Sequence, residues 1–173
     1  MLRLIVIGIV VIGSVLLEAT FIGHISIFGV APNLTLPIII AYSMMRGENG
    51  GAIVGFSAGL LQDIILGQAI GFFAMLGLLI GYFSGRPFRD FYRESYLLPM
   101  LFTGVIAVIY NFAIYIFNSL TIAPINIFYQ LGIVILPVSV YTMIFSILIY
   151  RIIYGINNLL EFFERRRRKI FER

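Results

Sequence analysis

The chain has 173 residues, of which 61% are hydrophobic and 12% are charged, and its mean hydropathy is +1.04. Soluble domains carry about 25% charged residues, so this composition excludes an ordinary soluble protein and indicates an integral membrane protein. The sequence has no cysteine, which excludes disulfides and thiolate metal sites. No polar stretch is long enough to fold outside the bilayer, so we expect a single membrane domain.

Six apolar runs are predicted to form helices, because a spanning helix needs about 20 apolar residues. In chain order they cover roughly 4–23, 32–45, 51–66, 69–85, 96–119 and 127–151. The second and third runs are short and would reach only about 20–24 Å at helical rise. Either the bilayer is thinner beside these two helices or neighbouring helices cover them. Pro137 lies inside the sixth run, where a proline should kink the helix.

The twelve basic residues set the expected topology. With six spans they all fall on one side of the membrane, and the connections around Ser26, Gly67 and Ile122 carry none. The positive-inside rule makes the basic side cytoplasmic, with both termini inside. A cleaved signal peptide at the first run is the less favoured alternative, since the charge separation requires that this helix is retained.

Glycines at a spacing of four are the strongest local pattern, and we expect the other helices to be organised around the third helix, which carries them. Residues four apart lie on one helix face, and small residues there let a second membrane helix approach closely. The pattern therefore predicts tight packing of the third and fourth helices against each other or against a partner. The third helix and the turn after it carry Gly51, Gly55, Gly59, Asp63, Gly67 and Gly71, and the fourth helix carries Gly77, Gly81 and Gly85.

Few polar residues lie inside the apolar runs. Asp63 follows the glycines at the end of the third helix, and a packing or capping role and a binding role are both consistent with that position. Glu18 and His24 fall in the same depth zone as Asp63, either as one polar cluster or as three separate interfacial residues. The amide of Asn111 is expected to bond between helices, and Asn33 opens the second helix.

The last residues form a basic tail, so we divide the chain into a six-helix domain over 1–155 and an amphipathic cytoplasmic tail over 156–173. Basic residues near an anionic inner leaflet contribute about 1 kcal/mol each, which favours lipid over nucleic acid as the partner of the tail. These residues are Arg165, Arg166, Arg167, Arg168 and Lys169. The sequence has one histidine and shows no catalytic triad, phosphate loop or metal-ligand spacing, so an enzyme or a cofactor-binding protein is not expected.

An ordered series of motifs carries a family resemblance. Ala31-Pro32-Asn33-Leu34 opens the second helix, Arg46-Gly47 follows it, and Gly55-x-x-x-Gly59-Leu60-Leu61-Gln62-Asp63 lies in the third, with Gly67 and Ile70-Gly71 after it. This series resembles the MreD family of bacterial rod-shape-determining membrane proteins. The motif-bearing part covers about residues 31–85, and the fifth and sixth helices match in character only. The matched family positions are Asn33, Gly55, Gly59, Asp63, Gly67 and Gly71.

The resemblance implies a non-enzymatic subunit of the complex that elongates the lateral cell wall, in the bacterial inner membrane. It implies association with MreC, a bitopic protein with a large periplasmic part, in a wider assembly with the MreB filament, a RodA glycosyltransferase and a class B penicillin-binding protein. The family is also similar in fold to the six-helix S components of vitamin transporters. An S component is therefore the alternative, although the first helix lacks the small-residue spacing usual in that class.

Overall fold

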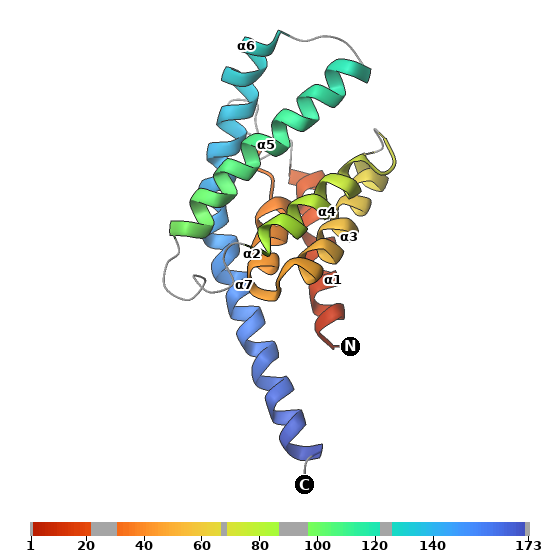
Figure 1. Cartoon of the computed structure of the whole chain (residues 1–173), viewed down its shortest axis with the longest axis vertical. Coiled ribbons are helices and arrows are strands. Elements are labelled where there is room, and N and C mark those ends of the chain that lie inside the picture. Colours follow the sequence, from red (N-terminus) through yellow and green to blue (C-terminus); the bar gives the residue numbers. More distant parts are fainter. Residues whose placement is uncertain (1, 22–30, 67–68, 87–96, 122–125, 172–173) are drawn as a thin grey trace.

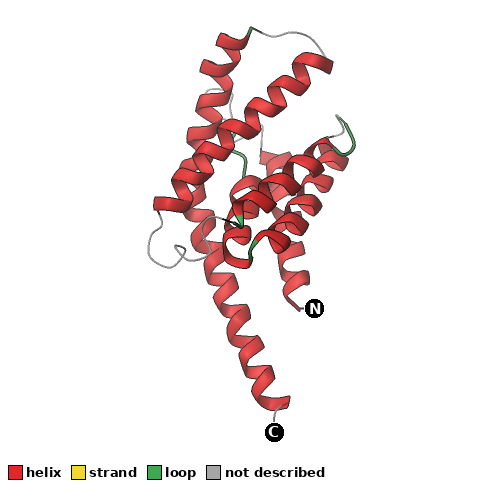
Figure 2. Ribbon diagram, viewed as in Figure 1, coloured by secondary structure: helices red, strands yellow, loops and turns green. Residues whose placement is uncertain are grey.

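The computed structural model describes residues 2–21, 31–66, 69–86, 97–121 and 126–171. Every regular element in these ranges is a helix, as Figure 2 shows, so the predicted all-α fold is confirmed. The first four helices are α1 (Leu2–Phe21), α2 (Thr35–Arg46), α3 (Glu48–Leu66) and α4 (Phe72–Ser84). They are followed by α5 (Leu97–Thr121), a short α6 (Ile127–Gln130), a π-helical turn η1 (Leu131–Ile135) and α7 (Leu136–Phe171).

The last helix is much longer than predicted. We expected it to end near residue 151, but α7 continues to Phe171 and leaves the bundle, with its carboxyl end far from the other helices (Figure 1). The helix therefore runs through most of the region that we assign to the tail, residues 156–171.

Pro137 is accommodated by a change of helical register. A proline inside a helix has no N–H to donate, and its ring clashes with the carbonyl four residues earlier. The π turn lies immediately before the proline, and the N–H of Leu136 reaches back five residues to the carbonyl oxygen of Leu131. The wider turn makes room where an α-helical register would produce the clash.

Helix α2 occupies the centre of the bundle, rather than the glycine-rich α3. Nine of its twelve residues are buried, because other helices pack around it. One apolar cluster joins α2 to α1, α3 and α7 through residues that include Ile39, Val54 and Ile153. A second cluster joins its other side to α4 and α5 through Ile40 and Tyr110, among others. At 12 residues, α2 is only about 18 Å long, and its neighbours rather than lipid cover it.

Two of the described helices are long and apolar enough to cross a membrane, over Pro99–Thr121 and Ile127–Leu160. Two shorter apolar helices lie over Ile5–Thr20 and Phe72–Ser84. Figure 1 shows α5 crossing α7, and both chain ends lie toward the same end of the molecule. At the other end, the carboxyl end of α5 and the start of α6 lie well beyond the carboxyl end of α3 and the start of α4.

Candidate functional site

The glycines of α3 lie directly against the backbone of α4. A Cβ added at Gly55 would collide with the carbonyl oxygen of Gly77, and one added at Gly77 would collide with that of Gly55. Gly51 and Gly81 meet in the same reciprocal way, and Gly59 faces the carbonyl of Phe73. The two backbones are therefore in van der Waals contact along most of the shorter helix. No open groove remains at these glycines for another protein.

The contact continues toward the inner turn. A Cβ on Gly85 would collide with the backbone N of Glu48, and Ser43 of α2 donates a hydrogen bond to the carbonyl oxygen of Gly81. Gly71 differs from the other glycines, because its φ of +103° lies in the left-handed region that favours glycine and no atom lies within 4 Å of its added Cβ. Gly67 lies outside the described residues.

Asp63 caps the amino end of α4. Its side chain is 1% exposed, and its two oxygens accept hydrogen bonds from the backbone N–H groups of Gly71, Phe73 and Ala74, each at 3.0 Å. Gly71 has no side chain to cap this helix, so the preceding helix supplies the carboxylate. The amino end of a helix carries a partial positive charge, which stabilises the carboxylate and offsets its unfavourable place at the carboxyl end of α3.

Glu18 caps the amino end of α2. One carboxylate oxygen accepts hydrogen bonds from the backbone N–H groups of Leu34 and Thr35, and the other accepts one from the hydroxyl of Thr35 at 2.8 Å. Asn33 adds a local cap, since its side-chain oxygen accepts the N–H of Leu36 at 2.7 Å. Each of the two short inner helices thus begins at a carboxylate from the preceding helix.

The Glu18 cap extends into a chain of hydrogen bonds across five helices or helix starts. Gln62 of α3 donates to Glu18 at 3.0 Å and accepts the hydroxyl of Tyr110 of α5 at 3.3 Å. On another side, the backbone N–H of Asn33 bonds the hydroxyl of Thr142 of α7 at 3.0 Å. We call six residues of this network the polar cluster: Glu18, Asn33, Thr35, Gln62, Tyr110 and Thr142.

A half-open pocket of about 240 Å³ lies beside the polar cluster. Glu18, Asn33, Gln62 and Tyr110 contribute its polar wall, and Asn111 contributes an amide whose N–H₂ bonds the carbonyl of Ala107 in its own helix. Apolar residues complete it, namely Val15, Ala19, Ala31, Pro32, Ile65, Phe73, Ile114 and Val138. A volume of this size accommodates a few side chains of a bound segment.

The opposite end of the bundle carries the basic residues. Arg46, at the end of α2, donates two hydrogen bonds to the side-chain oxygen of Asn157 at 3.2 and 3.0 Å. Arg86 forms an ion pair with Glu48 at 2.6 Å and stacks over the ring of Tyr82. The hydrogen bond to Glu48 raises the pKa of Arg86. The pocket and the basic end are therefore separated by the length of α2.

The structure brings together only part of the predicted polar set. Glu18 and Asn33 belong to one network, Asp63 caps a different helix, and Asn111 lines the pocket. His24 lies outside the described residues, and the side chains of residues 165–169 are not described, although their backbone is helical. Among the described residues, no group of three His, Asp or Glu is placed to hold a metal ion.

Sequence reasoning missed several members of the polar cluster. Gln62 was noticed only as part of a motif, and Thr35, Tyr110 and Thr142 were not singled out. Asn33 and Thr35 at the start of an apolar run are residue types that begin helices, and this signal was present in the sequence. The residues next to Tyr110 and Thr142 in the sequence do not identify either one as a member of the polar cluster. Each meets its partner only because helices that are distant in sequence pack together.

The comparisons with known proteins agree with this picture of a helical membrane protein. A family model described as rod shape-determining protein MreD matches residues 1–160. No curated protein and no solved structure matches the chain. Members of this family are membrane proteins that determine cell shape, and the apolar helices described above fit a membrane protein. The match covers most of the sequence, and the chain therefore belongs to the MreD family of rod shape-determining proteins.

Proposed function

We propose that this chain is a multi-pass, non-enzymatic subunit of the bacterial cell-wall elongation complex, which acts by binding an MreC-type bitopic membrane protein. Through that partner it helps to position peptidoglycan synthesis by the wider assembly of filament, RodA-type glycosyltransferase and class B penicillin-binding protein. Family membership supports the role in cell shape, and the resemblance described above supports the choice of partner.

The distribution of charge supports an orientation with both termini in the cytoplasm. Arg46 and Arg86 lie toward one end of the helices, and Glu18 and the pocket lie toward the other. Under the positive-inside rule the pocket then faces the periplasm. The tail over 165–169 follows on the cytoplasmic side, where its five basic residues favour anionic lipid.

We place the docking site in the pocket. The observation that carries this proposal is that the pocket is open whereas the glycine faces are filled. The glycine faces of α3 and α4 are filled by each other, so they leave no groove for a partner. The pocket, in contrast, is half open and offers both amide and apolar walls on the periplasmic side, where an MreC-type protein has most of its mass. A membrane-proximal segment of that partner would place a few side chains in the pocket.

Co-purification with a pocket-filling variant tests the proposal. Ile114→Trp places a large side chain in the pocket, whereas Ile116→Trp changes a 44% exposed residue of the same helix that does not line it. With an affinity-tagged MreC-type partner, we expect Ile114→Trp to reduce recovery at least about tenfold, equivalent to about 1.4 kcal/mol, and Ile116→Trp to leave it unchanged. Equal recovery of both variants at normal folding would contradict docking in the pocket.

The alternative of an S component receives no support from the comparisons. Mass spectrometry of the purified chain, together with depletion and microscopy, separates the two functions. Rounded cells without a vitamin requirement support the role in cell shape. A co-purifying vitamin with normal cell shape would contradict it.

A further inference from the structure

The lipid-facing surface of the α3–α4 hairpin is unusually short. Its exposed apolar residues run from Ile53 to Ile65 on α3 and from Met75 to Phe83 on α4. Twelve steps of helical rise give about 18 Å on α3, and the 13 residues of α4 give about 20 Å. Ser57 is exposed within this surface, but its hydroxyl already bonds the carbonyl oxygen of Ile53.

Polar groups and a closed turn fix both ends of this surface. At the cytoplasmic end the ion pair between Glu48 and Arg86 is partly exposed, with side chains 39% and 55% accessible, as suits the headgroup region. At the periplasmic end, Asp63 bonds the N–H groups of Gly71 and Phe73 and closes the turn. The hairpin cannot lengthen to meet a thicker bilayer, because the α3 and α4 backbones are locked by reciprocal glycine contacts.

The other flank of the molecule is much longer. Exposed apolar residues on α5 run from Leu97 to Leu120, about 35 Å of helix. A long helix adapts to the hydrocarbon core of about 30 Å by tilting, and α5 crosses α7 at a visible angle in Figure 1. Tilting shortens a span and never lengthens it. The hairpin therefore falls short of the hydrocarbon core by at least about 10 Å.

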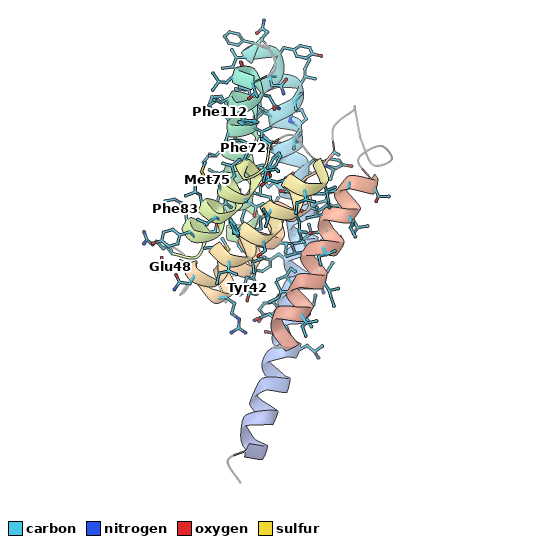
Figure 3. All side chains as sticks on the ribbon, turned by 90° about the vertical axis from the view of Figure 1, so that its right-hand side faces the viewer. Tyr42, Glu48, Phe72, Met75, Phe83 and Phe112 are labelled. Carbon is cyan, nitrogen blue, oxygen red and sulfur yellow. The ribbon has the colours of Figure 1, made fainter. Side chains whose placement is uncertain are left out.

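We infer that the α3–α4 hairpin thins the bilayer beside it, so that its lipid-facing surface selects short acyl chains. The inference rests on the proposed orientation of the chain in the membrane. Because the ion pair between Glu48 and Arg86 anchors the cytoplasmic end, the missing thickness falls on the periplasmic leaflet. Figure 3 shows Met75 and Phe83 on the outer side of α4, where they would contact these lipids.

The absence of tryptophan from the chain permits a direct test. Met75→Trp places one tryptophan on α4 at a residue 56% exposed, and Ile109→Trp places one on α5 at a residue 60% exposed, as the matched control. Each variant is reconstituted without a partner in phosphatidylcholine vesicles with monounsaturated chains of about 14 to about 24 carbons. Quenching by brominated lipid of each length gives the relative affinity of that lipid for each face.

We expect the affinity at Met75→Trp to peak at about 14 carbons and at Ile109→Trp at about 18 or more, a shift of at least about four carbons. Phe83→Trp, which replaces one aromatic ring by another, repeats the α4 measurement if Met75→Trp does not fold. The same optimum on both faces would overturn the thinning while leaving partner binding in the co-purification assay unaffected. Absence of quenching at either site would contradict the membrane placement itself.

Discussion

The carboxylate of Glu18 accepts hydrogen bonds from both the backbone N–H and the hydroxyl of Thr35, at 2.9 and 2.8 Å. An acidic residue of one helix thus fixes the start of another. Asp63 likewise accepts hydrogen bonds from the backbone N–H groups of Phe73 and Ala74 at the start of α4. Donors within the bundle form hydrogen bonds to both carboxylates. These bonds explain how the helical part of a membrane protein accommodates two acidic side chains.

The first prediction concerns the Glu18 cap. Glu18→Gln replaces an oxygen that accepts the Thr35 hydroxyl and the Gln62 amide by a nitrogen that donates, so both groups must turn over to bond it, and the charge of the cap is lost. We expect a loss of about 1–3 kcal/mol in the free energy of unfolding, measured in detergent. Adding Gln62→Glu supplies an acceptor for the new amide and still accepts the hydroxyl of Tyr110. The double variant should therefore lose less than the sum of the single losses, whereas additive losses would contradict the contact.

A second prediction separates the two kinds of glycine in the chain. Gly55→Ala forces a methyl group into the backbone of α4, where neither helix can move aside, so we expect a loss of about 3 kcal/mol or more. Gly155→Ala is the matched control, because this helical glycine has no atom within 4 Å of its added Cβ. It should gain about 0.5–1 kcal/mol from helix propensity. Thermal unfolding of both variants in the same detergent checks the sign of each change.

The glycine spacing was informative because it is a property of one helix face. Glycine at every fourth residue predicts a flat helix face, whichever element packs against it. The sequence thereby indicated that the third and fourth helices could approach closely. The same reasoning did not identify the centre of the bundle. Helix α2 is short and carries no unusual pattern, and its burial depends on the packing of five other helices around it.

The polar residues were harder to place. Glu18 and Asp63 were expected at similar depth, but the sequence did not reveal that each caps a different helix, because most of the donors are backbone N–H groups, which every residue type except proline carries. The end of α7 was missed for a different reason. Hydropathy marks where a helix leaves the apolar core, whereas the helical backbone of α7 continues beyond that point to Phe171.

A third prediction distinguishes the oxygens of Asp63 from its charge. Asp63→Asn retains one oxygen and should cost about 1–2 kcal/mol, whereas Asp63→Ala leaves three N–H groups without a partner, two of them buried, and should cost about 3 kcal/mol or more. Ser57→Ala, at an exposed residue of the same helix, should change stability by less than about 0.5 kcal/mol. Hydrogen exchange provides the local readout.

In that exchange experiment, the amides of Phe73 and Ala74 should exchange faster in Asp63→Ala than in the unchanged chain. The amides in the middle of α5 should keep their rates relative to global stability. Unchanged protection at the start of α4 would show that Asp63 does not cap this helix.

A fourth prediction addresses the orientation in the membrane. The chain has no cysteine, so single cysteines report accessibility without background. Ile70→Cys, at a residue 90% exposed at the tip of the hairpin, should react with a membrane-impermeant thiol reagent added outside spheroplasts. Asn49→Cys, at an exposed residue near the inner turn, should react only after permeabilisation. The reverse pattern would place the pocket on the cytoplasmic side and contradict the proposed docking.

The central claim is that an MreC-type partner enters the pocket beside the polar cluster, and disulfide cross-linking in the periplasm tests it most directly. Ile65→Cys lies in the pocket wall and is 40% exposed, whereas Ile116→Cys is similarly exposed, at 44%, and lies on α5 away from the pocket. Each is combined with single cysteines along the membrane-proximal periplasmic segment of the partner. We predict cross-links to Ile65→Cys and none to Ile116→Cys. Cross-links to Ile116→Cys alone would contradict docking in the pocket.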